Sequence, residues 1–324
     1  MRHAFDLSPD QIKEAIGDEG YFVIAGPTAS GKSALALALA NTVSGTIVNA
    51  DSMQIYADLR VITARPSEAD EAAAPHSLYG VMDGAERASV ARWLEMVATE
   101  VAAIRAAGRV PILTGGTGMY VNAAMQGIAS IPDVPADLHA NISARLKKIG
   151  GAAFRAELMD LDPVTATRLF DGDSQRLVRA MGVVQATGRS ISDWQQDPHQ
   201  GMLSGTAVTI GVLPPREVLY ERINARFEAM IADGALDEVA ALGARQLDPG
   251  LPVMKALGVR ELLAYQAGTM RLDEAGTLAK RDSRHYAKRQ MTWLRNNFST
   301  QFVLNEKFSE SFLKNIFSHL LKTD

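Results

Sequence analysis

The feature that most constrains this chain is a glycine-rich loop between an apolar segment and a helix-forming segment. The loop, residues 26–33, reads GPTASGKS and fits the pattern G-x-x-x-x-G-K-[ST]. Residues 21–25 before it are mostly apolar, as in a buried parallel strand, and residues 34–40 after it are rich in Ala and Leu, which favour helix. A strand, a glycine loop and a helix in this order distinguish a phosphate-binding loop from a chance match. The chain is therefore predicted to bind a diphosphate or a triphosphate here.

The loop offers three kinds of group for phosphate binding: backbone N–H groups, a cation and a hydroxyl. Gly26 and Gly31 allow backbone conformations in which N–H groups point inward, and the helix that begins near Lys32 adds a positive dipole end. Lys32 supplies a cation for a terminal phosphate, and the Ser33 hydroxyl suits a Mg²⁺ ion that bridges phosphate oxygens. The residues predicted to bind phosphate are Gly26, Pro27, Thr28, Ala29, Ser30, Gly31, Lys32 and Ser33. The motif identifies phosphate, but it does not identify a nucleotide.

Length and composition exclude several classes of protein. The 324 residues are enough for one large α/β domain and a smaller one, and with a net charge of −4 any nucleic-acid partner must be held by a local basic patch. The lack of cysteine excludes disulfides, thiolate catalysis and cysteine-ligated zinc. The sequence has no run of about eighteen apolar residues and no secretory pattern at its N-terminus. These features predict a soluble, cytoplasmic protein with no membrane partner.

A second predicted strand, residues 46–48, leads into NADSMQIY at residues 49–56. This order places Asp51 at the carboxyl end of a strand, where open α/β sheets hold their ligands. The alternatives for Asp51 are an aspartate that organises Mg²⁺ and one that caps a turn. Farther along, Arg65 in the loop TARPS (residues 63–67) is a candidate second cation for phosphate.

A third predicted strand, residues 110–113, leads into TGGTGMY at residues 114–120. Two glycines before Thr117 permit the backbone to approach a ligand closely, although a tight turn from strand to helix would use the same residues. Residues 78–82 are also predicted to form a strand. His76, beside a proline, is interpreted as a packed or capping residue and is not assigned to the site.

The rest of the chain is predicted to be largely helical. Residues 131–135, IPDVP, form a linker, and strand character returns only at 207–213. The predicted helices are a first one capped by Ser8 with Pro9 at its first position, then 89–108, 138–149, 152–161, 165–170, 174–187, 216–231, 236–242, 255–266 and 272–297, with an amphipathic tail at 308–321. The fold class is therefore α/β, a P-loop NTPase-like parallel sheet flanked by helices with an all-helical insertion. The predicted parts are residues 1–130 (first part of the core), 131–200 (insertion) and 201–324 (second part of the core with C-terminal helices).

Two polar segments lie in these helices. In QRLVR at residues 175–179, the spacing places Gln175, Arg176 and Arg179 on a shared face. Residues 280–295 carry six cations and one anion, together with Tyr286 and Trp293. Each segment is either a solvated helix face or a contact for phosphates or nucleic acid.

In this order, seven motifs resemble those of the tRNA dimethylallyltransferase family, which transfers an isopentenyl group to the adenine beside the anticodon. The motifs are GPTASGKS (26–33), NADSMQIY (49–56), TARPS (63–67), TGGTGMY (114–120), DSQRLVRA (173–180), ALGVREL (256–262) and RHYAKRQMTWLR (284–295). A phosphate loop alone is common, whereas seven motifs in order over most of the chain are highly specific. The departures are Arg65, where Lys is common, and ALGVREL, which lacks the Gly-Tyr of many members.

The resemblance implies a reaction and roles for the residues. The phosphate loop would hold dimethylallyl diphosphate with Mg²⁺, and N6 of adenine 37 in tRNAs that read codons beginning with U would attack the allylic carbon and expel diphosphate. Asp51 would accept the N6 proton, while Thr117 and Lys32 would stabilise the leaving oxygen. The insertion would grip the anticodon stem-loop of a base that must leave the stack. The residues implied to contact tRNA are Asp51, Ser52, Met53, Gln54, Thr117, His139, Gln175, Arg176, Leu177, Val178 and Arg179. The family also implies a monomer.

Three other functions fit parts of the sequence. A P-loop kinase of a small metabolite would bind ATP at the same loop with the same Mg²⁺, and an adenylate isopentenyltransferase would use free AMP, ADP or ATP as acceptor. A non-catalytic tRNA-binding module is the third. The DSMQ and QRLVR segments argue against the first, the helical insertion against the second, and the intact set of Asp51, Thr117 and Lys32 against the third.

Overall fold

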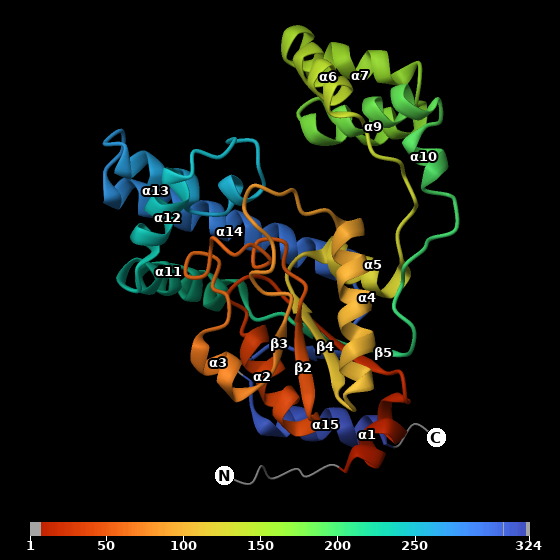
Figure 1. Ribbon diagram of the computed structural model, residues 1–324, viewed down its shortest axis with the longest axis vertical. Coiled ribbons are helices and arrows are strands. Elements are labelled where there is room, and N and C mark those ends of the chain that lie inside the picture. The colour runs from red at the N-terminus through yellow and green to blue at the C-terminus, as the bar shows by residue number, and fades with distance from the viewer. Residues whose placement is uncertain (1–7, 307, 322–324) are drawn as a thin grey trace. The chain divides into compact units, whose positions relative to one another are not determined.

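The computed structural model describes residues 8–306 and 308–321, which fall into two compact units (Figure 1). The α/β unit comprises Met1–Met125 and Leu203–Asp324, and the helical unit comprises Gln126–Met202. The helical unit thus interrupts the α/β unit between its fourth and fifth strands. Among the described residues, no helix is both long enough and apolar enough to cross a membrane.

A six-stranded parallel sheet forms the centre of the α/β unit, with the strand order β3-β2-β4-β1-β5-β6. In the register, Val23 of β1 lies opposite Leu113 of β4 and Thr209 of β5. The strands are β1 Tyr21–Ala25, β2 Gly45–Asn49, β3 His76–Ser77, β4 Val110–Gly115, β5 Ala207–Val212 and β6 Phe302–Leu304. The predicted fold class is confirmed: the sheet is parallel, helices flank it, and a helical segment is inserted.

The core of this unit forms because β1 is apolar on both faces. All five of its residues are buried, and Phe22 and Ile24 belong to one cluster with Leu35 and Leu39 of the helix that follows. Burial of such side chains contributes about 1.5–3 kcal/mol each, so this packing sets the position of the loop that joins β1 to that helix. Truncation of Leu39 to Ala is expected to cost about 2–5 kcal/mol.

Helices cover this sheet and extend beyond it. They are α1 Pro9–Ile16, α2 Lys32–Val43, α3 Glu68–Ala73, α4 Val90–Ala106, α5 Gly118–Gln126, α11 Arg216–Ala232, α12 Ala235–Ala244, the 3-10 helix Val253–Lys255, α13 Val259–Gln266, α14 Leu272–Asn297 and α15 Glu310–Leu320. The predicted cap of α1 is confirmed, since the Gln11 N–H donates to Ser8 Oγ at 3.2 Å. The bounds predicted for α14 agree with the structure.

Two predictions in this unit are wrong in detail. The strand predicted at 78–82 does not form, because Leu78 has φ +63° and Gly80 also has φ +63°, which turn the chain out of the sheet after β3. The helix predicted at 255–266 begins only at residue 259, because Gly258 has φ +89° and separates it from the preceding 3-10 turn. The sequence analysis did not predict α3, α5 or β6.

The helical unit has a core of its own, built from α6 Ala136–Ile149, α7 Gly151–Met159, α8 Pro163–Arg168, α9 Ser174–Thr187 and α10 Ile191–Trp194. Phe154, Leu158, Leu177 and Met181 are buried together in this core. The chain enters and leaves the unit through an antiparallel bridge, in which Ile128 and Gln200 exchange two backbone hydrogen bonds of 3.0 and 2.9 Å. A buried carboxylate, Asp162, caps α8 by accepting the N–H of Thr165 at 3.0 Å.

Candidate active site

The loops that follow β1, β2 and β4 meet at the carboxyl edge of the sheet. Because β4 lies between β1 and β2, Ala25 is paired with Gly115, and Asn49 is paired with Thr114. The phosphate loop follows the first of these strands, Asp51 the second and Thr117 the third. Parallel topology therefore brings together three segments that are far apart in the sequence, at the edge where open α/β sheets bind ligands.

The phosphate loop has the backbone that its glycines predict. Gly31 has φ +99°, and a Cβ atom on Gly26 would lie 2.6 Å from Ser30 Oγ and 2.8 Å from the Val212 carbonyl oxygen. Any side chain at Gly26 would therefore displace the loop or β5. The helix α2 begins at Lys32, so its free N–H groups face the loop, and Ser33 is exposed in its first turn.

Lys32 is held within the loop rather than extended into solvent. Its Nζ donates to the Pro27 carbonyl oxygen at 3.4 Å. Burial lowers the pKa of Lys32 to about 8; the negative charge of Asp51 opposes this shift, and the positive charge of Arg226 adds to it. The loop thus holds a lysine whose charge has few compensating partners, which is the electrostatic condition for binding an anion.

Asp51 is oriented by the backbone around it. Its N–H donates to Asn49 Oδ1 at 2.8 Å, and its Oδ1 accepts the Met53 N–H at 3.0 Å. Asn49 is fully buried, and its Nδ2 donates to the carbonyl oxygens of Asp51 and Leu78, both at 3.0 Å. The carboxylate is therefore fixed at the end of β2, close enough to Lys32 and Arg226 to act on the pKa of both.

Thr117 lies against the residue that follows Asp51. The Ser52 N–H donates to Thr117 Oγ1 at 3.0 Å, and Thr117 Oγ1 donates to Ser52 Oγ at 3.2 Å. Tyr286 of α14 also lies close to the Thr117 side chain, and burial followed by the charge of Asp51 raises the pKa of Tyr286. The structure thus brings Thr117, from the loop after β4, next to Asp51 and Ser52, from the loop after β2.

The loop after Asp51 is held by its own side chains. Gln54 Nε2 donates to the carbonyl oxygens of Thr63 at 2.9 Å and Ala64 at 2.8 Å. Ser52, Met53 and Gln54 are all partly buried beside Asp51. The amide of Gln54 therefore stabilises the loop from which Ser52, Met53 and Gln54 are predicted to contact RNA.

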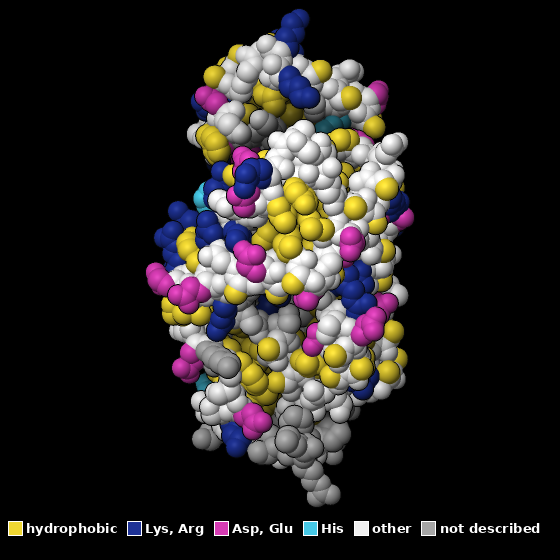
Figure 2. Space-filling view, turned by 90° about the vertical axis from the view of Figure 1, so that its left-hand side faces the viewer, with side chains coloured by type: hydrophobic (Ala, Val, Ile, Leu, Met, Phe, Trp, Pro, Cys, Tyr) yellow, Lys and Arg dark blue, Asp and Glu magenta, His cyan; other side chains and the backbone are white. Residues whose placement is uncertain are grey.

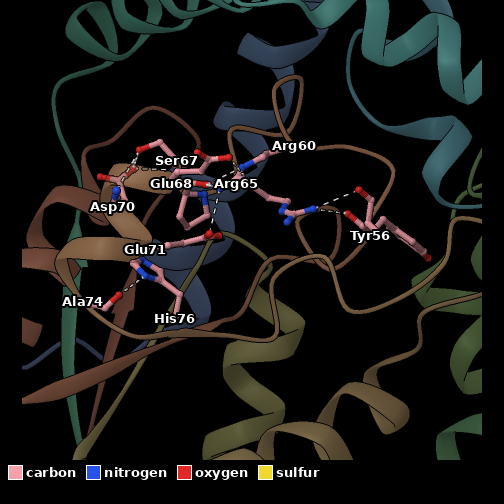
Figure 3. A network of polar contacts seen from close by, with 11 residues as sticks. Tyr56, Arg60, Arg65, Ser67, Glu68, Asp70, Glu71, Ala74 and His76 are labelled. Atoms are coloured by element: carbon pink, nitrogen blue, oxygen red, sulfur yellow. Dashed lines mark hydrogen bonds and ion pairs between the residues drawn. The ribbon is translucent and has the colours of Figure 1, made fainter.

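Arg65 lies in the same loop and points back into it (Figure 3). Its Nη1 donates to the carbonyl oxygens of Tyr56 at 3.2 Å and Ala57 at 3.4 Å, and the guanidinium packs against Gly80. Burial, followed by the neighbouring charge of Arg60, lowers the pKa of Arg65. This residue therefore has a structural role in the loop, and its contact with phosphate stays a prediction. His76, also in Figure 3, bonds the Ala74 carbonyl oxygen through Nδ1 at 2.8 Å, which is the packed role expected for it.

Two helices from the second part of the chain reach the phosphate loop, α11 outside the seven motifs and α14 within the motif at 284–295. From α11, Arg222 Nη1 donates to the Ser30 carbonyl oxygen at 3.1 Å, and Arg226 is close enough to influence Lys32. From α14, Gln290 contacts both the phosphate loop and the loop after β4. Sequence reasoning missed Arg222, Arg226 and Gln290, because its only signal was the basic character of residues 280–295.

The basic segment of α14 is partly neutralised within the α/β unit. Lys280 forms an ion pair with Glu228, Arg281 bonds Asp282 at 2.8 Å, and Arg284 donates to Asn224 at 2.8 Å. Lys288 and Arg295 are exposed on the same helix. On the face of the molecule in Figure 2, Lys and Arg side chains alternate with Asp and Glu rather than forming one continuous field. A contact of α14 with RNA phosphates stays a prediction.

In the helical unit, the five residues of QRLVR divide between surface and core. Gln175 and Arg176 are exposed at the start of α9, and Arg176 bonds Asp173 at 3.1 Å. Arg179 is partly buried and donates to the Pro132 carbonyl oxygen at 3.4 Å. Leu177 and Val178, in contrast, are 0% and 6% exposed.

The prediction that this whole segment faces RNA therefore needs a correction. Leu177 and Val178 lie on the inner side of α9, in the core of the helical unit, because successive residues of a helix are about 100° apart around its axis and only part of its circumference faces solvent. Only Gln175, Arg176 and part of Arg179 present their side chains at the surface. His139 is exposed on α6 of the same unit, and its contact with RNA stays a prediction.

The chain is similar to one set of known proteins over nearly its whole length. The family model "IPP transferase" matches residues 54–297, and the model "Isopentenyl transferase" matches residues 19–82. A tRNA dimethylallyltransferase from Rhodospirillum rubrum is 51% identical over 305 residues, which is 93% of this chain and 94% of the relative. One from Paramagnetospirillum magneticum is 47% identical over 92% of this chain and 96% of the relative.

Solved structures extend the similarity to three dimensions. The full-length tRNA isopentenylpyrophosphate transferase of Bacillus halodurans has a TM-score of 0.67 at 30% identity, with coverage of 94% of this chain and 97% of that one. A eukaryotic dimethylallyltransferase captured acting on tRNA has a TM-score of 0.71 at 26% identity, with coverage of 85% and 69%. The family model with the longer match spans α9, α11, α14 and the loop after β4, and it covers the loop after β2 from residue 54 onward.

Proposed function

This chain belongs to the tRNA dimethylallyltransferase family, and we propose that it transfers a dimethylallyl group to N6 of adenine 37, next to the anticodon of tRNAs that read codons beginning with U. The donor is dimethylallyl diphosphate, and the products are N6-(dimethylallyl)adenosine in tRNA and diphosphate. The observation that carries this proposal is the meeting of the phosphate loop, Asp51 and Thr117 at one edge of the sheet.

The phosphate loop would bind the diphosphate of the donor. Free N–H groups at the start of α2 and the buried cation of Lys32 favour an anion with several negative charges. Arg226, which shares the surroundings of Lys32 and Asp51, would be a second cation for the same group. A bound diphosphate would also keep Lys32 protonated, because a neighbouring negative charge raises the pKa of a lysine.

Mg²⁺ would accompany the diphosphate. The described residues contain no group of three or more His, Cys, Asp or Glu side chains that could enclose a metal. This fits a Mg²⁺ ion that is held chiefly by substrate oxygens and water, with the Ser33 hydroxyl as the protein ligand. The ion would neutralise charge on the departing diphosphate.

Asp51 would act as the general base. The lone pair of adenine N6 is delocalised into the ring, so attack on the allylic C1 becomes easier if the N6 proton is accepted as the N–C bond forms. In this step the bond between C1 and the diphosphate oxygen breaks, its electron pair leaves with diphosphate, and one N6 proton passes to Asp51. The hydrogen bond from the Met53 N–H to Oδ1 fixes the carboxylate.

Negative charge develops on the leaving oxygen, and fixed donors would stabilise it. Lys32 and the N–H groups of the phosphate loop supply donors on one side, and the Thr117 hydroxyl supplies one from the loop after β4. The Thr117 hydroxyl now donates to Ser52, so it would rotate toward the leaving oxygen when the donor binds.

The target base lies within a stacked anticodon loop and must be extruded to reach the edge of the sheet. Gln175, Arg176, Arg179 and His139 would contact the stem-loop from the helical unit. We further propose that the enzyme is a monomer in the cytoplasm. Light scattering of the purified protein would test the first statement and fractionation of the source cells the second.

The decisive experiment incubates the protein with Mg²⁺ and radiolabelled dimethylallyl diphosphate, together with bulk tRNA or with AMP. Label should appear in tRNA, and Lys32→Ala should abolish it. The same substitution should remove the rise in melting temperature that the donor causes in the wild type. Label in AMP would instead support an adenylate isopentenyltransferase, which the match of the second family model to residues 19–82 keeps as the alternative. Phosphoryl transfer from ATP would support a kinase and refute the proposal.

A further inference from the structure

The side chain of Gln290 connects the two loops that carry the proposed phosphate site and Thr117. Its Oε1 accepts the Thr28 N–H at 2.9 Å, and its Nε2 donates to the Gly116 carbonyl oxygen at 2.8 Å. Gln290 is only 6% exposed although it comes from the long helix α14, far in sequence from both loops. A buried amide with both halves satisfied by two different backbones is a rigid connection.

The loop after β4 is shaped to receive this side chain. A Cβ atom on Gly116 would lie 2.2 Å from Gln290 Nε2, so a glycine is needed where the amide approaches the backbone. At Gly116 and Gly118 the loop thus meets α14 with no side chain of its own in between. This close approach explains the second glycine of the sequence TGGTG.

Gln290 is one of several side chains on one face of α14 that contact the loop after β4. Tyr286, one turn earlier, lies close to the side chains of Thr117 and Gln290 and has its pKa influenced by both. Trp293, one turn later, packs its ring against Gly118. Residues spaced by four and three positions share one face of a helix, so a single face of α14 contacts the whole turn that presents Thr117.

We propose that Gln290 is a positioning residue, which sets the distance between the phosphate loop and Thr117 by bonding Thr28 and Gly116 at the same time. It contacts neither substrate. Gln290 would hold the donors of the phosphate loop and the Thr117 hydroxyl at a fixed distance from each other. These donors can then stabilise the negative charge that develops on diphosphate without further rearrangement. This inference rests on the transferase function proposed above.

The chemistry of the two bonds is specific for an amide. Glutamate keeps an acceptor for the Thr28 N–H, but its carboxylate would face the Gly116 carbonyl oxygen, which is also an acceptor. A protonated carboxyl group, in contrast, has both a donor and an acceptor. Methionine has a similar length and makes neither bond.

The test compares single-turnover rates of the wild type, Gln290→Met and Gln290→Glu, with tRNA and dimethylallyl diphosphate at saturation, from pH 5.5 to about 8.5. Gln290→Met should lower the rate about 10- to 100-fold at every pH, while the KM for tRNA changes less than about threefold. The rate of Gln290→Glu relative to the wild type should rise at least about tenfold as the pH falls, because protonation restores the donor to Gly116. The use of this ratio removes any pH effect that both proteins share.

A matched control is Gln301→Met. Gln301 Oε1 accepts the Thr209 N–H at 2.8 Å between β5 and β6, so this change also removes a backbone contact within the same unit. It should lower the melting temperature and leave the single-turnover rate within about twofold of the wild type. A constant rate ratio for Gln290→Glu over the pH range would overturn the inference, and so would a normal rate in a folded Gln290→Met. Lack of label in tRNA with the wild-type protein would instead refute the function itself.

Discussion

Replacement of Lys32 by Met should stabilise the ligand-free protein while it removes donor binding. In the folded protein the pKa of Lys32 is lowered from 10.5 to about 8, because burial disfavours its charge. Each pKa unit corresponds to about 1.4 kcal/mol, so the charged lysine costs at most about 3.5 kcal/mol at neutral pH. Because the side chain is only partly buried, solvent reduces this to about 1–3 kcal/mol.

The size of this effect changes with pH in a defined window. Since the pKa is lower in the folded protein, the unfolded chain binds more protons between about pH 8 and pH 10.5, and the stability of the wild type rises with pH there. The cost is therefore complete below pH 8 and disappears as the pH approaches 10.5. Lys32→Met lacks this dependence, so its stability advantage should shrink over the same window.

Urea unfolding of wild type and Lys32→Met at pH 7 and at several values up to pH 10 would measure this difference. The control is Lys288→Met, which removes an exposed lysine from α14 and should show no such window. A wild type that is as stable as Lys32→Met at pH 7, or a difference that stays constant with pH, would refute the reasoning. Addition of diphosphate with Mg²⁺ should reverse the order, because the ligand stabilises only the protein that binds it.

The remaining predictions concern the base, the helical unit and its core. Asp51→Asn should bind tRNA and donor normally but lose about 10²–10⁴-fold in rate, and near-normal turnover would remove Asp51 from the role of base. Replacement of Arg176 and Arg179 by Ala should raise the KM for tRNA and reduce the slope of affinity against salt by about one to two units, with unchanged affinity for the donor alone; an unchanged salt slope would leave both as solvated residues. Leu177→Ala should cost about 2–5 kcal/mol of unfolding free energy, measured by urea titration, because this side chain is fully buried in the core of the helical unit. A loss of tRNA affinity in a fully stable Leu177→Ala would contradict that assignment.

The parts of the fold that could be predicted from sequence are those determined by neighbours in the chain. The strand, loop and helix around Lys32 depend on local apolar residues, glycines and helix formers, and the structure has them where the sequence predicts them. The helices at 174–187 and 272–297 were also predicted correctly, since each has a strong period and a clear end. The sequence analysis also placed Asp51 and Thr117 each after the end of a strand, and in the structure Thr117 bonds Ser52, the residue after Asp51.

What could not be predicted depends on contacts between distant segments. The strand β6 has three residues and forms because β5 offers it an edge, so no pattern in Phe302–Leu304 distinguishes it from a loop. Gln290 and Arg226 were missed because polar residues on a helix are usually solvated, and only the folded chain turns these two toward the phosphate loop. Leu78 was assigned to a strand by its apolar side chain, although its backbone has a left-handed conformation that the side chain does not reveal.

The bridge between Ile128 and Gln200 has a consequence for how the chain assembles. The two ends of the helical segment are fastened to each other by two backbone hydrogen bonds, and the next residue after the segment, Leu203, donates to the Ala124 carbonyl oxygen. The long connection between β4 and β5 is therefore closed at its base, like a short loop. The entropic cost of closing this connection grows only slowly with the number of residues that it contains. Insertions or deletions among α6 to α10 change the length of this closed segment and leave the pairing of the six strands unchanged. Variation in this segment can thus change the residues proposed to contact RNA while the strands that carry the proposed active site keep their pairing.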